Sequence, residues 1–466
     1  MRSTSPAGSG LTPSLARWIA CALAAVLALC ASTLWATAPN VYAIKGARVV
    51  TAAGAPIASG TVVLRNGLID AVGADVSAPA GSITIEGSGL TVYPGLIDMG
   101  HSAAVDVPAV SRPETVRTLE EAERLKRLEI FRPDLLAAEH LRAESPDLAR
   151  LASVGITSVL ATPPGALVKG QSALVNVVAP PDEPQIGGVG DYRRGLQILR
   201  TPVALHVEFP QTIAGDGYPV SLIGAIALVR QSFLDAQYQQ AAASRYERMK
   251  GVGLPRPTHD AALDALQPAL AGRLPVAFAA DRAREIHRAL DLAQEFKLDP
   301  IITGGRESDL VAADLKARGA RVVYSLNYPT RSVLLAPDAE EPIASLRERA
   351  RAPKVPAALD KAGVPFAFSS SGLRESRDFL RNAARAVKEG LPPDAAVRAL
   401  TIGAARIAGA SDRVGSIERG KIANVIVTDG DLFEEKTRIR HVFVDGREVV
   451  LEAPRPQPRK GGASGG

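Results

Sequence analysis

The sequence is poor in residues that crosslink a chain or ligate metals. Its two cysteines, Cys21 and Cys30, and its two tryptophans all lie within the first 38 residues. Residues 39–466 therefore contain no cysteine, which excludes disulfides, thiolate metal sites and cysteine nucleophiles from that part. Histidine is also scarce, with six in 466 residues. A metal site would need those histidines, carboxylates or a modified lysine.

Aromatic residues make up 4% of the chain, and no basic run is interleaved with them. The net charge of +5 is spread along the sequence, so we expect no nucleic-acid partner. A composition of 46% hydrophobic and 22% charged residues is typical of a folded globular protein. The length accommodates one large barrel and a smaller domain.

The N-terminus has the pattern of a secretory signal. Arg2 and Arg17 flank a polar segment, an apolar stretch follows over 18–34, and small residues end it at Ala36-Thr37-Ala38. We predict a signal peptide over 1–38 and an exported protein, periplasmic or secreted. Pro39 disfavours cleavage directly before it, so an uncleaved leader that anchors the chain to a membrane stays open as an alternative.

Strand and helix patterns alternate through the middle of the chain, which favours a parallel α/β barrel. Short alternating runs at both ends, with turns at Asn66-Gly67 and Asp445-Gly446, predict further strands. The expected barrel strands are 96–99, 157–161, 203–207, 276–279, 300–303, 322–326 and 366–369, with an eighth within 174–178. The expected helices are 221–238, 282–296, 308–317, 377–388 and 395–408.

The stretch Tyr93-Pro94-Gly95-Leu96-Ile97-Asp98 resembles the start of the barrel in the amidohydrolase superfamily, particularly its imidazolonepropionase-like members. Segments 155–160, 170–173, 218–231, 399–405 and 414–424 are similar to segments of the same family, although Asn424 stands where relatives usually have Asp. The resemblance implies a TIM-like (β/α)8 barrel of the metal-dependent hydrolase type plus a small β-sandwich formed by both chain ends. The implied boundaries are β-sandwich 39–93, barrel 94–410, β-sandwich 411–453 and disordered tail 454–466.

Active members of that family bind one or two divalent metals, usually zinc, and this chain departs from every expected ligand position. The His-x-His pair of the first strand falls on Gly100 and Ser102, with His101 between them on the opposite face of the strand. The later histidines fall on Ala279 and within 304–306. The final Asp falls within 369–371, where Ser370 and Ser371 stand. The family motif therefore predicts no metal site and no cofactor.

Other residues near the predicted strand ends offer a nonstandard ligand set for zinc: Asp98, His101, His206, Glu208 and Asp281. His206 and Glu208 are two apart on a strand and share a face, so a site of His101, His206 and Glu208 is the weaker alternative. Lys169 lies in a Gly-rich stretch that predicts a loop. Ser370 and Ser371 would need a neighbouring base to act as nucleophiles, and polar capping is the favoured interpretation.

Two functions remain open. The resemblance implies a hydrolase of non-peptide carbon–nitrogen bonds in a small linear or cyclic amide. The missing ligands favour instead a catalytically inactive, metal-free pseudo-amidohydrolase that serves as a periplasmic binding or scaffold protein. Either one has a small-molecule substrate or ligand as its partner. The sequence leaves both the ligand and self-association into a homo-oligomer open.

Overall fold

The computed structural model describes residues 41–451, apart from 103, 112, 114, 144, 179–190, 194, 211, 214–216 and 337. The expected signal peptide over 1–38 and the expected tail over 454–466 lie outside the described residues. The described residues from Val41 onward form one compact unit. Within the described ranges, no helix is long and apolar enough to cross a membrane.

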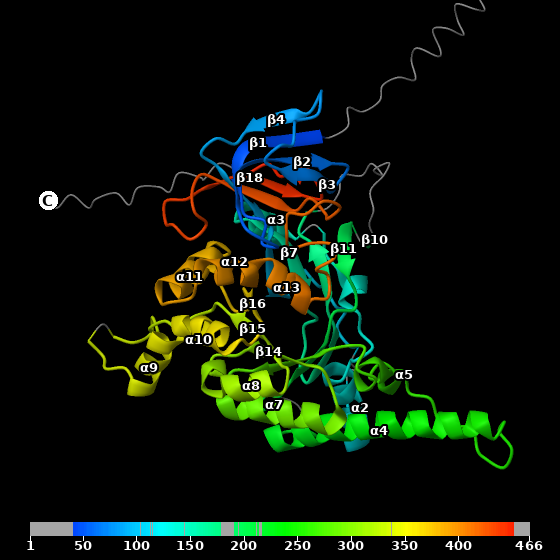
Figure 1. Ribbon diagram of the computed structural model, residues 1–466. Helices are drawn as coiled ribbons and strands as arrows, with labels where there is room; N and C mark the ends of the chain where they lie inside the picture. The colour runs from blue at the N-terminus through cyan, green and yellow to red at the C-terminus, as the bar shows by residue number, and fades with distance from the viewer. Residues whose placement is uncertain are drawn as a thin grey trace, which may run out of the picture. The chain divides into compact units, whose positions relative to one another are not determined.

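Strands from both chain ends join in one eight-stranded sheet (Figure 1). Its order is β19-β18-β17-β5-β1-β2-β3, with β4 beside β1. Asn66-Gly67 and Asp445-Gly446 have positive φ at both positions, as hairpin turns of the predicted kind require. The strands are β1 (Val41–Val49), β2 (Ile57–Arg65), β3 (Leu68–Gly73), β4 (Ile83–Glu86), β5 (Thr91–Pro94), β17 (Val425–Thr428), β18 (Ile439–Val444) and β19 (Arg447–Glu448).

This terminal sheet curls back on itself. Leu68 of β3 bridges Ile422, which precedes β17, and the amide of Ala423 donates to the carbonyl of Gly67 at 2.8 Å. The curl encloses an apolar core that includes Ile44, Val92 and Phe443. The sequence pattern of short alternating strands at both ends is confirmed, because segments almost 400 residues apart share one sheet.

The seven strands first expected in the middle of the chain are present, and they pair with one another in parallel. β6 pairs with β7, and β12 through β16 pair in consecutive order. They are β6 (Leu96–His101), β7 (Ile156–Ala161), β12 (Leu205–Glu208), β13 (Val276–Ala280), β14 (Pro300–Gly304), β15 (Arg321–Ser325) and β16 (Phe366–Ser369).

The expected eighth strand differs from the prediction. β9 (Ala173–Asn176) runs antiparallel to β7, and β8 (Val168–Gln171) runs antiparallel to β12. The chain therefore leaves one mixed sheet and enters the other across Ser172. β10 (Asp191–Arg193) and β11 (Leu196–Arg200) extend the β6–β7 sheet beyond β9. Alternation of apolar residues does not report strand direction, which explains the miss.

Helices follow the parallel strands, as the alternating pattern predicts. The expected helix 221–238 runs ten residues further, and 395–408 is two helices that break at the buried Thr401. The longer helices are α2 (Leu119–Ile130), α3 (Pro146–Ser153), α4 (Leu222–Arg248), α7 (Ala283–Phe296), α9 (Ile343–Arg351), α10 (Val355–Ala362), α11 (Arg377–Lys388) and α12 (Pro393–Leu400). The short ones are η1 (Ala137–His140), α5 (Ala261–Asp264), α6 (Gln267–Leu270), η2 (Ser308–Val311), α8 (Ala312–Ala317), η3 (Ala352–Lys354) and α13 (Ile402–Ile407).

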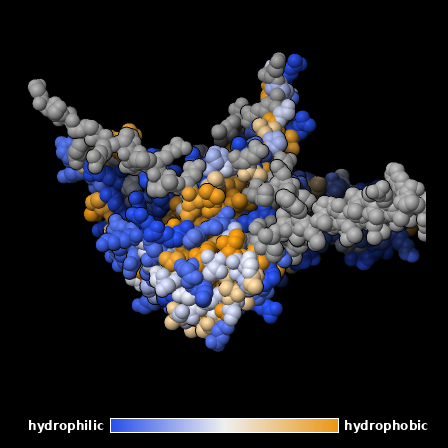
Figure 2. Space-filling model, turned by 90° about the horizontal axis from the view of Figure 1, so that it is seen from above, coloured by the Kyte–Doolittle hydropathy of each residue, from blue (hydrophilic) through white to orange (hydrophobic). Residues whose placement is uncertain are grey.

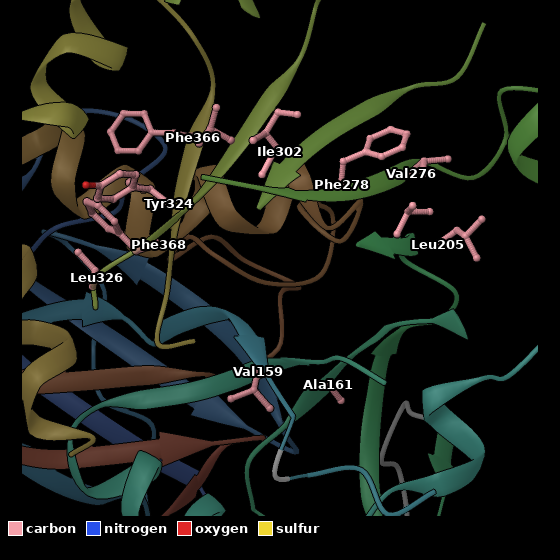
Figure 3. Packing of buried hydrophobic residues seen from close by; sticks show 14 of the residues in the cluster. Val159, Ala161, Leu205, Val276, Phe278, Ile302, Tyr324, Leu326, Phe366 and Phe368 are labelled. Atoms are coloured by element: carbon pink, nitrogen blue, oxygen red, sulfur yellow. The ribbon is translucent and has the colours of Figure 1, made fainter. Parts of the chain in front are cut away.

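Both faces of the parallel strands are buried, as is usual where helices cover a parallel sheet. Figure 3 shows one face, where Phe278, Tyr324 and Phe368 pack with other apolar side chains. Residues one position away, such as Ala277, Val323 and Ala367, form a second, separate cluster. Seen from above, apolar residues gather toward the middle of the surface among hydrophilic ones (Figure 2).

Candidate functional site

The carboxyl ends of the parallel strands are where α/β proteins place their ligands. Strand register puts His206 beside Ala277, and Glu208 beside Ala279. Ala277 belongs to the second apolar cluster, and Leu205 and Val207 to the first. Because side chains alternate along a strand, His206 and Glu208 share the face of Ala277 and Ala279. We call this the inner face.

Asp98 anchors the end of β6 to the end of β16. Its carboxylate is fully buried and accepts hydrogen bonds from the Ser370 amide at 2.8 Å, the Ser370 hydroxyl and the Gly100 amide at 3.2 Å. Burial raises the pKa of Asp98, and the Ser370 hydroxyl is the largest of the influences that oppose this rise. Both sequence candidates are therefore brought together, with Ser370 holding Asp98 in place.

Gly100 occupies the first expected ligand position, and the Ser369 side chain lies where a side chain at position 100 would begin. A Cβ at Gly100 would lie 2.4 Å from the Ser369 hydroxyl oxygen. That hydroxyl also accepts from the Ser371 amide at 3.0 Å. Ser369 thus occupies the volume that a longer side chain at position 100 would need. Ser102, the second expected position, is exposed.

His101 lies against this cluster. Its Nδ1 is 4.0 Å from the Asp98 carboxylate, and 15% of its side chain is exposed. Its Nε2 is buried and has no hydrogen-bond partner among the residues described. Alternation along a regular strand predicted His101 on the opposite face, but the pairing of β6 with β7 is irregular between Asp98 and His101, and His101 lies beside the buried carboxylate with one ring nitrogen unused.

Lys169, His206 and Glu208 form a second polar group on β8 and β12. Lys169 was expected in a loop, but it lies in β8 and its ammonium pairs with the Glu208 carboxylate. His206 is 8% exposed, and its Nε2 has no partner in the described part of the chain. Burial, and then the Lys169 charge, lowers the pKa of His206 to about 3. His206 is therefore neutral at physiological pH.

Asp281 comes directly after the end of β13. Arg306 lies 3.4 Å from its carboxylate and also 3.4 Å from the carboxylate of Glu348 in α9. Burial raises the pKa of Asp281, and the Arg306 charge opposes this rise. The pairing ties α9 to the strand ends, so Asp281 and Arg306 have a structural role that accounts for their position.

The expected family metal does not fit these residues. The ligand positions carry Gly100, Ser102, Ala279 and residues 369–371, which provide hydroxyls and methyl groups instead of imidazoles and carboxylates. Over the described ranges, no three His, Cys, Asp or Glu side chains are grouped so that they could hold a metal ion. The nonstandard set of His101, His206 and Glu208 is therefore not assembled.

Sequence reasoning missed two of the residues that shape the site. Ser369 was expected as the last residue of the strand 366–369, without its contact to Gly100, and Lys169 was set aside because of its glycine neighbours. Gly170 adopts φ +116 within β8 and passes close to the Leu135 carbonyl. A glycine at a close backbone approach inside a strand is the signal that would have indicated a strand here.

Three comparisons relate this geometry to known proteins. The sequence model of the family described as "Amidohydrolase family" matches residues 279–449. No curated protein matches the chain. Among solved structures, an amidohydrolase from Thermotoga maritima is similar with a TM-score of 0.67 and 23% identity, covering 88% of this chain and 99% of that one.

Two further structures share the fold. A prolidase in complex with N-methylphosphonate-L-proline has a TM-score of 0.52 at 19% identity, and a Xaa-Pro dipeptidase with bound methionine has 0.50 at 16%. Each comparison covers 88% of this chain and 99% of the other. The fold is therefore of the TIM-barrel-like α/β type that these proteins share.

Proposed function

Because residues 279–449 match the model of the amidohydrolase family and the described chain shares the fold of a solved amidohydrolase, we propose that the protein is a metal-free pseudo-amidohydrolase. It binds a small organic molecule at the carboxyl ends of its parallel strands and does not carry out metal-dependent hydrolysis. Hydroxyls, the Lys169–Glu208 pair and the unused ring nitrogens of His101 and His206 are the groups that would contact the ligand.

The packing of Gly100 against Ser369 carries this proposal. A chain that had merely lost a histidine would leave a gap where the side chain had been. Here the Ser369 hydroxyl stands 2.4 Å from the point where any side chain at position 100 would begin. Such a separation is far shorter than a van der Waals contact. The first ligand position thus carries no side chain, and the Ser369 hydroxyl occupies the neighbouring space, which supports a site without the family's metal centre.

The proposal includes the finer architecture. We infer that the sheets of β6–β7 and β12–β16 close into a barrel, because the Asp98–Ser370 contacts link their free edges and one apolar cluster takes residues from both. We also infer that the curled terminal sheet is the β-sandwich of this family. The boundaries 39–93, 94–410 and 411–453 follow from that assignment.

Export is proposed on the sequence of residues 1–38, whose charged, apolar and small-residue segments follow the order of a secretory signal. A periplasmic or secreted protein with a small-molecule ligand is the resulting picture. If the leader is not cleaved, residues 41–466 stay tethered to a membrane.

A hydrolase of carbon–nitrogen bonds is the second candidate, favoured by the family match over residues 279–449. Family members usually depend on zinc, so this function requires ligands other than the expected ones. The two functions differ in what a chelator does, since chelation abolishes metal-dependent turnover and leaves metal-free binding unchanged.

The test uses residues 41–466, purified without a histidine tag, in parallel with and without Zn²⁺ and a chelator. Hydrolysis of N-acyl amino acids, Xaa-Pro dipeptides and phenylureas is measured, together with thermal shifts for a panel of small amides and carboxylic acids. We expect no turnover in any arm, and at least one ligand whose thermal shift the chelator leaves unchanged. That shift should fall in Lys169→Met but not in Lys436→Met, a change on the terminal-sheet side of the chain. Chelator-sensitive turnover would instead establish the hydrolase.

A further inference from the structure

The helix α4 presents a long face to solvent that no part of the described chain covers. Its opposite face buries Ala225, Val229 and Phe233, and its second half extends past α2 and α5 (Figure 1). Ile223 is 80% exposed, Leu234 42% and Tyr238 77%. A contiguous exposed apolar strip of this kind marks an interaction surface.

The exposed apolar residues follow helical spacing. Ile223, Ala227, Leu234 and Tyr238 are separated by four, seven and four residues, so they lie on one face. A groove of about 370 Å³ runs along this strip, lined by Ile223, Ile226, Ala227, Arg230, Gln231 and Leu234. Arg230 pairs with Glu295 at 2.7 Å, which neutralises the charge within the groove. We call this surface the α4 face.

The α4 face continues into basic residues. Arg245 and Arg248 follow Tyr238 by seven and ten residues and are exposed on the same side of the helix. Glu247 is one residue from Arg248 and two from Arg245, so its side chain points elsewhere. The turn after the helix adds the exposed side chains of Lys250 and Arg256, together with Met249 at 51% and Val252 at 73% exposure.

We propose that the α4 face docks on an anionic lipid surface, with the helix lying along the membrane plane. A helix with an apolar strip and basic residues beside it binds in this manner. The opposite face of α4 is packed against the protein, so only the exposed strip could contact lipid and the helix would lie along the surface. The charges favour a lipid surface over a second copy of the chain. A second copy with its α4 antiparallel would cover the apolar strip, but it would place the first turn of its α4 against Arg245 and Arg248. That turn has no acidic residue to pair with them.

The experiment is co-sedimentation of residues 41–466 with vesicles, since the described residues of this stretch form one compact unit. One set is phosphatidylcholine alone, and the other contains about one third phosphatidylglycerol. We expect binding to the anionic vesicles only, and release in high salt because screening weakens the attraction. Each basic residue near such a surface contributes about fivefold in affinity. Arg245→Gln/Arg248→Gln should therefore weaken binding about 25-fold.

Two matched variants sharpen the test. Leu234→Ser/Tyr238→Ser removes apolar contact at exposed positions and should also weaken binding. Arg419→Gln/Lys436→Gln makes the same change in charge on the terminal-sheet side, at exposed positions, and should leave binding unchanged. Equal binding to both vesicle types, or no effect of Arg245→Gln/Arg248→Gln, would overturn the proposal. So would a homodimer that Leu234→Ser/Tyr238→Ser dissociates and that vesicles do not bind.

Discussion

A buried amide network between the terminal sheet and the β6–β7 sheet makes Asn424 the most informative residue to change. Its Nδ2 donates to the Ser158 hydroxyl at 3.0 Å and to the Asn176 carbonyl oxygen at 2.8 Å. Its Oδ1 accepts from the Asp445 amide at 2.9 Å. Ser158 and Asn176 are fully buried, and Asn424 is 5% exposed. The Asn424 amide therefore joins two parts of the fold.

The substitution Asn424→Asp keeps the shape of the side chain and removes both donors. Two lost hydrogen bonds are worth about 1 kcal/mol each. An ionised carboxylate would also face the Asn176 oxygen in a buried position, which costs about 1–3 kcal/mol more. We therefore expect the free energy of unfolding to fall by about 3–5 kcal/mol at pH 7.

The pH dependence separates the charge from the lost bonds. Burial would raise the pKa of the new carboxyl above its unfolded value of about 3.9. The penalty is then complete above the raised pKa and declines as pH falls, because the folded state takes up the proton first. Asn424→Ala, which loses both Nδ2 bonds and also the bond from the Asp445 amide without gaining a charge, should show a deficit that does not change with pH.

Urea denaturation of residues 41–466 at pH 7, 6 and 5 provides the assay, with midpoints compared at equal slope. An Asp variant within about 0.5 kcal/mol of the wild type at pH 7 would refute the reasoning. The reasoning would also be refuted if Asn424→Asp and Asn424→Ala lowered the free energy of unfolding by the same amount at every pH.

Two further predictions concern the strand ends. Gly100→Ala should lower the free energy of unfolding by about 1–3 kcal/mol through overpacking against Ser369. Adding Ser369→Ala should relieve most of that cost, because the next atom that the new Cβ meets, the Cβ of residue 369, is 3.4 Å away. Urea melts in which the effects of the two substitutions simply add would contradict this. His206 stays neutral in the folded protein, where its pKa is about 3, but titrates near pH 6.5 in the unfolded chain. The unfolded chain therefore takes up a proton first as pH falls, and the free energy of unfolding decreases by about 2 kcal/mol between pH 7 and pH 5. His206→Asn should remove that part of the slope, and an unchanged slope would show that another group is responsible.

The fold could largely be predicted from the sequence because its strands have strong local signals. Seven of the eight apolar runs expected as parallel strands are parallel strands, and the turns at Asn66-Gly67 and Asp445-Gly446 form as their residue types require. The direction of β8 and β9 could not be predicted, since pairing across Ser172 depends on contacts distant in sequence.

The candidate site was predicted less completely. Asp98 and Ser370 were both identified, but their direct contact joins residues 272 positions apart. The pairing of Lys169 with Glu208 depends on β8 lying beside β12, which no periodicity reports. Residue identity could exclude the family's ligand set, whereas only the structure could show that Ser369 fills the space above Gly100.

Metal content per chain tests the central claim most directly. Residues 41–466 are purified without a tag or added metal and analysed by inductively coupled plasma mass spectrometry before and after dialysis against a chelator. Our account predicts well under one equivalent of any transition metal, removed by dialysis without a change in the thermal midpoint. About one equivalent of zinc that survives dialysis and disappears in His206→Asn would contradict it.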